Sequence, residues 1–189
     1  MTESQTSQTK SRRPLDWTAV KGPRAISCLA IATSLGAGLF PFAPGTMGTL
    51  FSVPLTYWTN PWAWPLRAVL WIFLFVIGTW SAKVFDELMH SKDNQNIVID
   101  EVVGYGITAW TAGREWKTLL AAFVLFRFFD VIKPTPIRQV DEWSKIKAGE
   151  NRGESSRWWG GFGVMADDVL AGIQGLIVIL ILQHFQFLP

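Results

Sequence analysis

The sequence contains a single cysteine, Cys28, and only two histidines, His90 and His184. One cysteine cannot form a disulfide within the chain, and Cys28 lies in an apolar run, where a thiol usually serves as a packing residue. Charged residues make up only 17% of the chain and the net charge is +2. So small a charge gives no electrostatic basis for binding nucleic acid.

Apolar and aromatic residues are abundant instead. Hydrophobic residues make up 49% of the chain, which includes 11 Trp and 13 Phe. This composition is too apolar for a typical soluble domain and favours a membrane protein. The 189 residues suit one domain. We expect residues 1–24, which are basic and rich in Ser, Thr and Gln, to form a disordered tail. We expect residues 25–189 to form the domain, with no cleavable signal peptide.

Apolar runs separated by polar turns predict an all-α bundle with about four to five membrane-embedded helices. The runs cover residues 25–40, 49–58, 66–82, 102–112, 118–132 and 169–187. Several are shorter than the ~20 residues that a straight span needs. The short polar turn 113–117 predicts a helical hairpin between the runs on either side of it.

The distribution of basic residues predicts the orientation in the membrane. They cluster before residue 25 and again between Lys133 and Arg157, so both regions should face the cytoplasm. The uncharged connection 60–65 contains two Trp, as expected of a short outer turn at the membrane interface. We therefore predict that residues 142–159 are a polar cytoplasmic loop, and that the turn 113–117 and the C-terminus are outside.

Ionisable residues lie directly beside the apolar runs, and on this topology all are at the cytoplasmic side. They are Asp100, Glu101, Arg127, Asp130, Asp167 and Asp168, with Thr46, Asp93, Lys133, Arg138 and Asp141 at the same level. Charges at a membrane edge are costly and usually face the bundle interior, where they are paired or functional. An excess of carboxylates suits Mg²⁺, and Arg and Lys suit phosphate oxygens.

Each group also has a purely structural explanation. Asp167 and Asp168 could cap the N-terminus of the last helix, and Asp100–Glu101 could do the same for an earlier one. Arg127 and Asp130 could form an ion pair on one helix face. Three such coincidences at one depth favour a functional site.

The stretch "FPFAPGTMGTL", residues 40–50, marks a break between two apolar runs. Its two prolines stop a helix, and Gly45 and Gly48 permit close approach of backbones. Thr46 then stands where its hydroxyl and the neighbouring N–H groups could bind an anion at the start of the next helix. The alternative is a simple helix–turn–helix corner at the membrane surface.

Four blocks in order resemble phosphatidylglycerophosphatase A, a family of bacterial membrane lipid phosphatases. They are "GLFPFAPGTMGTL" (38–50), "DNQNIVIDEVVG" (93–104), "FRFFDVIKPTPIRQVD" (126–141) and "GGFGVMADDVLAG" (160–172). The resemblance covers residues 34–175. It implies an all-helical bundle in the bacterial inner membrane. The several crossings and the cytoplasmic active face are predicted from the apolar runs and the basic residues. The resemblance further implies Mg²⁺ as cofactor and hydrolysis of phosphatidylglycerophosphate to phosphatidylglycerol.

The resemblance also implies which residues act. We expect catalytic roles for Asp100, Glu101, Arg127, Asp130, Asp167 and Asp168. We expect metal binding by Asp93, Asp100, Glu101, Asp167 and Asp168. We expect substrate binding by Thr46, Arg127, Lys133 and Arg138. The chain departs from the family at Thr135, where an aromatic residue is common, and in its longer polar stretch 142–159.

Other mechanisms lack their residues. Cys28, His90 and His184 lie outside all four blocks, which disfavours a covalent cysteine or histidine intermediate. A metal-assisted attack by water is favoured, with direct attack by an Asp left open. The alternative from another class is a non-catalytic cation transporter or channel subunit. A CDP-alcohol phosphotransferase is disfavoured because its long run of spaced aspartates is missing. The oligomeric state and the tolerance for other lipid phosphates stay open.

Overall fold

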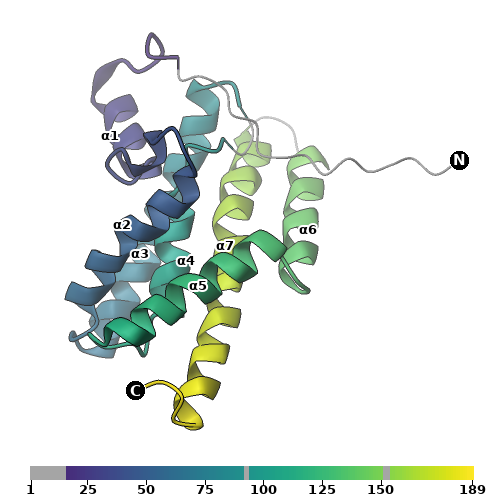
Figure 1. Ribbon diagram of the computed structural model, residues 1–189. Coiled ribbons are helices and arrows are strands. Elements are labelled where there is room, and N and C mark those ends of the chain that lie inside the picture. Colours follow the sequence, from purple (N-terminus) through teal and green to yellow (C-terminus); the bar gives the residue numbers. More distant parts are fainter. Residues whose placement is uncertain (1–15, 92–93, 151–153) are drawn as a thin grey trace, which may run out of the picture.

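The computed structural model describes residues 16–91, 94–150 and 154–189, and these are helical with no strand among them (Figure 1). The elements are α1 (Gly22–Ala32), the 3-10 helix η1 (Ala37–Leu39), α2 (Pro44–Thr59), α3 (Trp64–Leu88), α4 (Ile99–Thr108), α5 (Trp116–Ile132), α6 (Ile137–Glu150) and α7 (Glu154–His184). The predicted all-α class is thereby confirmed. The predicted tail 1–24 falls mostly outside the described residues, and α1 begins at Gly22.

Prolines set several helix boundaries. Pro23, Pro44 and Pro65 lie in the first turns of α1, α2 and α3, where the missing N–H has no partner to lose and the fixed φ suits a helix. At the other end of α5, Lys133 adopts a left-handed conformation with φ +47°, and Pro134 follows it. The proline has no N–H to continue the helix, so the chain turns into α6 at this point.

Helix α7 is the central element and packs against α3, α4, α5 and α6 (Figure 1). Its crossing with α4 is close because two glycines meet there. A Cβ on Gly172 would lie 2.4 Å from the Gly104 carbonyl oxygen, and a Cβ on Gly104 would lie 2.6 Å from the Asp168 carbonyl oxygen. Asp100 lies one helical turn before Gly104. The crossing therefore brings the start of α4 to the middle of α7.

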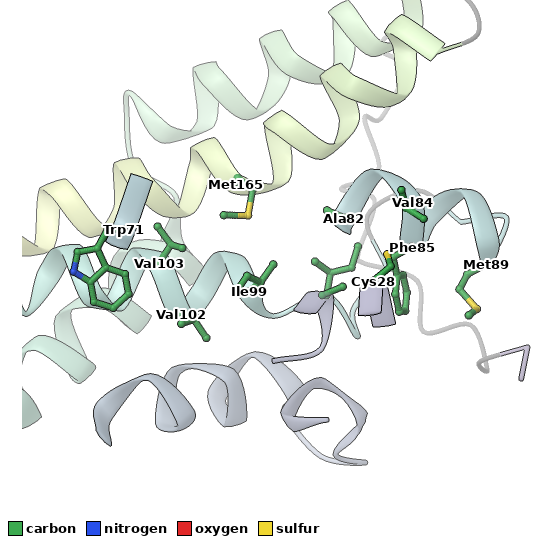
Figure 2. Close-up of a cluster of buried hydrophobic side chains, with 12 residues drawn as sticks. Cys28, Trp71, Ala82, Val84, Phe85, Met89, Ile99, Val102, Val103 and Met165 are labelled. Atoms are coloured by element: carbon green, nitrogen blue, oxygen red, sulfur yellow. The ribbon is translucent and has the colours of Figure 1, made fainter. Parts of the chain in front are cut away.

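Apolar side chains pack on both sides of α4 and bury nearly all of it. One cluster joins α4 to α1, α3 and α7 through residues such as Cys28, Phe85, Ile99 and Met165 (Figure 2). A second cluster joins α4 to α5, α6 and α7 and includes Tyr105, whose hydroxyl donates to the Leu119 carbonyl at 3.1 Å. A helix enclosed on both sides buries its polar residues as well as its apolar ones.

Three connections meet at one end of the bundle, the lower end in Figure 1. Asn60 Nδ2 donates to the carbonyl oxygens of Ala109 at 3.1 Å and Gly113 at 2.8 Å. Thr111 Oγ1 donates to Gln183 Oε1 at 2.8 Å, near the C-terminal end of α7. The α2–α3 turn, the α4–α5 turn and the end of α7 therefore share one side, as the predicted topology requires. The compartment that this side faces stays a prediction.

The expectation of about four to five membrane-embedded helices is wrong. Among the described residues, only Trp64–Leu88 and Ser155–His184 are long and apolar enough to cross a membrane. Helices α2, α4 and α5 have 16, 10 and 17 residues. At 1.5 Å per residue they measure about 15–26 Å, less than a bilayer core of about 30 Å. The apolar runs do form helices, but prolines and polar turns end these helices early.

The predicted loop 142–159 is also different from expectation. Apart from residues 151–153, which lie outside the described residues, it forms the second half of α6 and the first turns of α7. Trp143 of α6 contacts Trp159 of α7 edge to face, with ring centroids 5.1 Å apart. The polar sequence therefore forms a helix packed on α7, not a loop.

A band of exposed apolar side chains covers the outer faces of α3, α5 and α7. It comprises Val69, Ile72, Phe73, Val76, Leu120, Val124, Phe128, Ile173, Ile177, Leu180 and Ile181. Four exposed tryptophans lie near the end that Asn60 marks: Trp58, Trp62, Trp64 and Trp116. An apolar band of this extent marks a contact surface, and tryptophans at its edge are typical of a membrane–water interface.

The glycine crossing gives a stability prediction. Gly172→Ala should lower the free energy of unfolding by about 1–3 kcal/mol, since the added Cβ meets the α4 backbone, which cannot move without separating the helices. The melting temperature in detergent should fall by about 2–10 °C. Gly160→Ala, on the same helix with nothing within 4 Å of the new Cβ, is the control and should not lower it. Equal melting temperatures for the two variants would contradict this account of the crossing.

Candidate active site

Three carboxylates lie together where α4 crosses α7. Asp100 and Glu101 belong to the first turn of α4 and Asp168 to α7, and one oxygen from each lies within 4.8 Å of the others. Their exposed fractions are 1%, 5% and 4%. Like charges so close repel one another, and burial removes the water that would screen them. A bound cation would offset both costs.

The donor set fits a hard divalent cation. Carboxylate oxygens are the ligands that Mg²⁺ and Ca²⁺ prefer, and no sulfur or nitrogen ligand belongs to the set. Asp168 Oδ2 is buried and accepts no hydrogen bond from the described part of the chain, so it can still take a ligand. The N-terminal position of Asp100 and Glu101 on α4 also lets the helix dipole offset part of their charge, as the structural explanation proposed.

The first turn of α2 closes the cluster from another side. A Cβ on Gly45 would lie 2.4 Å from Glu101 Oε1 and 3.1 Å from Arg127 Nη1, so a larger residue here would push these side chains aside. Ala43, with φ +47°, turns the chain into α2 just before it. The break predicted from Pro and Gly therefore lies at the site. Thr46 follows Gly45 and is half-buried, and its contact with an anion stays a prediction.

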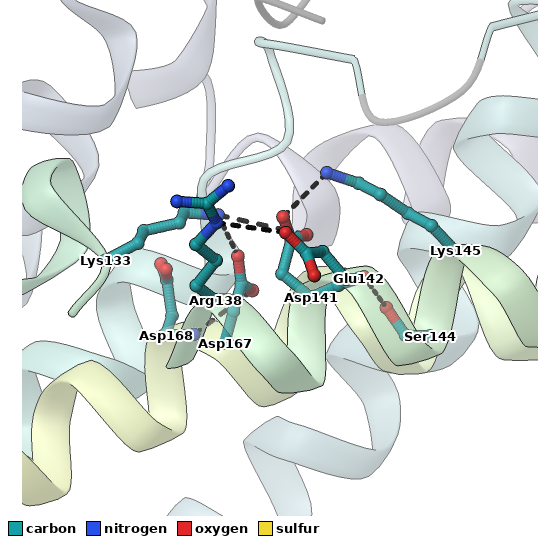
Figure 3. Close-up of polar contacts among 8 residues, drawn as sticks. All are labelled: Lys133, Arg138, Asp141, Glu142, Ser144, Lys145, Asp167 and Asp168. Carbon is teal, nitrogen blue, oxygen red and sulfur yellow. Dashed lines mark hydrogen bonds and ion pairs between the residues drawn. The ribbon is translucent and has the colours of Figure 1, made fainter. Parts of the chain in front are cut away.

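Two cations border the three carboxylates, and each is paired with other carboxylates outside that cluster. Arg127 Nη1 lies 2.7 Å from Asp130 Oδ2 in the predicted ion pair. Lys133 Nζ donates to Asp167 Oδ2 and lies 4.0 Å from Asp141 Oδ1 (Figure 3). Burial disfavours the charged ammonium, but the Asp167 and Asp141 carboxylates outweigh that effect and raise the pKa of Lys133 above its usual value. Lys133 is therefore an ammonium ion.

The positions of Asp167 and Asp168 exclude the helix-cap explanation. Helix α7 begins at Glu154, so both residues lie well inside it, where backbone N–H groups are already bonded. Successive helical residues point about 100° apart. This rotation lets Asp167 reach Lys133 while Asp168 faces Asp100 and Glu101. The adjacent pair therefore serves two different partners.

One expected site residue, Arg138, is not part of this group in the structure. Arg138 is 72% exposed on its side chain and pairs with Glu142 on the surface of α6, at 3.0 Å. Asp93 lies outside the described residues.

One participant was missed by sequence reasoning. Lys145 Nζ lies 2.7 Å from Asp141 Oδ2 (Figure 3), and the spacing of four residues between them was its available signal.

Comparison of the sequence with known proteins identifies the class of this helical bundle. The protein is a phosphoric monoester hydrolase. More specifically, the chain belongs to the phosphatidylglycerophosphatase A family. The sequence pattern of that family matches residues 30–183. That match contains every described residue of the site.

Three relatives are similar over most of their length. A phosphatidylglycerophosphatase A from Haemophilus influenzae is 34% identical over 82% of this chain and 88% of its own. One from Escherichia coli is 31% identical over 82% of each chain. A protein from Bacteroides thetaiotaomicron, provisionally named a phosphatidylinositol-3-phosphatase, is 34% identical over 79% of this chain and 89% of its own. No solved structure matches the chain.

The geometry predicts different effects for the two adjacent aspartates. Asp168→Asn should lower phosphate release about a hundredfold or more, since it removes a charge from the carboxylate cluster. It should leave the melting temperature unchanged or higher, because it also relieves repulsion. Asp167→Asn should lower activity by weakening the hold on Lys133, and it should lower stability by breaking a buried ion pair.

The control for both variants is Glu115→Gln, an exposed change at the opposite end of the bundle, which should preserve both quantities. Activity and thermal unfolding are measured on the same preparations. Near-wild-type turnover of Asp168→Asn would contradict a role for the carboxylate cluster in the chemistry.

Cys28 is predicted to be dispensable for the reaction. Its thiol is buried, donates to the Ser81 carbonyl at 3.0 Å, and has its pKa raised to about 12 by burial. A thiol with so high a pKa is not a nucleophile at neutral pH. Cys28→Ser should therefore keep most of the activity in a phosphate-release assay. A loss of several orders of magnitude in a normally inserted protein would require a covalent mechanism.

Proposed function

We propose that this protein hydrolyses phosphatidylglycerophosphate to phosphatidylglycerol and phosphate at the bacterial inner membrane, with Mg²⁺ as cofactor. The observation that carries the proposal is the buried group of Asp100, Glu101 and Asp168 beside two cations, in a chain of this family. Two of the relatives bear the name of this activity. The exposed apolar band and the two long apolar helices suit an enzyme whose substrate is a lipid.

Asp100, Glu101 and Asp168 would hold the cation, with Asp93 as a further ligand predicted from its motif. When bound, the cation supplies charge stabilisation at the phosphoryl oxygens and a water of lowered pKa. The buried position of the three carboxylates strengthens these interactions, because little water competes with them.

Arg127 and Lys133 would bind the phosphate oxygens. Asp130 orients the Arg127 guanidinium, and Asp167 and Asp141 hold the Lys133 ammonium from two different helices. Cations fixed in this way lose little entropy on meeting the substrate, and they stand ready for the charge that develops during transfer. Thr46, at the start of α2, would donate to the same phosphate. Arg138, exposed on α6, would meet the headgroup further out.

The chemistry is a displacement at phosphorus. The oxygen of a water molecule bonds to the phosphorus atom, and the bond to the glycerol oxygen breaks. A carboxylate of the cluster takes a proton from the water, and a proton goes to the glycerol oxygen, which leaves as the hydroxyl of phosphatidylglycerol. Water as nucleophile is preferred to direct attack by an aspartate because the buried carboxylates already share one cation site.

The transporter alternative has no support from the relatives, all of which are named as phosphatases. The choice of lipid is the open point, because one relative is named for a phosphorylated inositol lipid. The cytoplasmic position of the active face rests on the basic residues between Lys133 and Arg157.

The test is a phosphate-release assay with purified protein in detergent. Phosphatidylglycerophosphate should be hydrolysed with Mg²⁺, and chelator should abolish turnover until Mg²⁺ is restored, because three buried carboxylates cannot hold the phosphate without a cation. Phosphatidylinositol 3-phosphate serves as the competing substrate and should give a far lower kcat/KM. Full turnover in excess chelator would refute the metal requirement. Preference for the inositol lipid would refute the assigned substrate.

A further inference from the structure

An exposed apolar rim borders the acidic site, and nothing in the chemistry described above uses it. Phe40 and Phe42, in the turn before α2, and Val131, near the end of α5, form this rim. The exposed fractions of Phe42 and Val131 are 77% and 71%. Val131 lies one helical turn beyond Arg127 on the same face of α5. The rim therefore flanks the place where Gly45 meets Glu101 and Arg127.

Phe42 is close to the reacting centre. Phe42 precedes Gly45 by three positions, so its Cα lies within roughly 11 Å of the Gly45 Cα. In phosphatidylglycerophosphate about eleven bonds join the reacting phosphorus to the first acyl carbonyl, a reach on the order of 10–13 Å. A lipid whose phosphate meets Arg127 would thus bring the start of its acyl chains to the rim.

The surroundings of the rim suit hydrocarbon rather than a polar partner. Residues 25–66 contain no Asp, Glu, Lys or Arg, so this side of the site offers no charge for a protein partner to pair with. On α2 the exposed surface continues through Leu50 and Phe51, and on α5 through Phe128 and Val124. The rim is therefore continuous with the apolar band that the proposed function assigns to the membrane.

We propose that Phe40, Phe42 and Val131 form a seat for the acyl chains of the substrate, through which the lipid enters sideways from the bilayer while its phosphate reaches Arg127 and Lys133. This inference rests on the proposed function. It makes the turn before α2 a determinant of substrate class, selecting phosphate esters with long acyl chains over water-soluble phosphate esters. The aromatic side chains shield hydrocarbon that leaves the bilayer to follow the headgroup.

The first test compares two substrates with the same headgroup, dioleoyl and dibutyryl phosphatidylglycerophosphate, in the same detergent. Phe42→Ser should lower kcat/KM for the dioleoyl lipid roughly tenfold relative to the dibutyryl lipid, mostly through KM, and Phe42→Leu should restore the ratio. Phe73→Ser is the matched control, an exposed phenylalanine of the apolar band on α3, and it should leave the ratio unchanged. An equal loss on both substrates, or the same shift in Phe73→Ser, would overturn the proposal.

The second test does not depend on catalysis. A spin label is attached at Phe42→Cys in a Cys28→Ser background, and the protein is placed in phosphatidylglycerol vesicles. Oxygen, which concentrates in hydrocarbon, should relax the label more strongly than a water-soluble nickel complex. The opposite order would overturn the acyl seat. If no phospholipid is hydrolysed but the label lies in hydrocarbon, the assigned reaction fails while the membrane contact of the rim stands.

Discussion

The close crossing of α4 and α7 is the constraint on which the rest of the site depends. Gly104 and Gly172 let the two backbones touch, and this contact brings Asp100 and Glu101 of one helix to Asp168 of the other. Larger residues at the crossing would hold the helices apart, and the carboxylates would no longer lie close enough together to bind one cation. The apolar packing around α4 then keeps these acids away from water. The same packing that stabilises the bundle thus strengthens the repulsion among the three carboxylates, which a bound cation would offset.

The cations are organised from other helices. Arg127 and Lys133 come from the end of α5, and Lys133 is held by Asp167 of α7 and Asp141 of α6. Lys145 also pairs with Asp141, so this one carboxylate of α6 interacts with two lysines. Charges fixed by partners on separate helices cannot relax independently. The site is therefore preorganised, with its positive side on α5 and its negative side on α4 and α7.

The short helices explain how a lipid phosphatase can bring polar chemistry to a membrane. Helices α3 and α7 are long enough to cross, whereas α2 begins and α5 ends beside the acidic site. The start of α2 supplies Gly45, and the end of α5 supplies Arg127 and Lys133. A bundle made only of full spans would have its helix ends at the two surfaces, and it would leave no backbone turn at the depth of the carboxylates.

The sequence by itself determined the all-helical class, the position of the turn before α2, the residue types of the site and the family, because apolar periodicity, prolines and local motifs act over short distances. It also predicted the Arg127–Asp130 pair, which depends only on helical spacing. The tertiary structure decided that Asp167 and Asp168 serve different partners, that Arg138 lies on the surface, and that only two of the described helices have the length of a span. These outcomes depend on where α7 begins and on how closely it crosses α4. Contacts between residues far apart in the chain set both, and no local pattern records them.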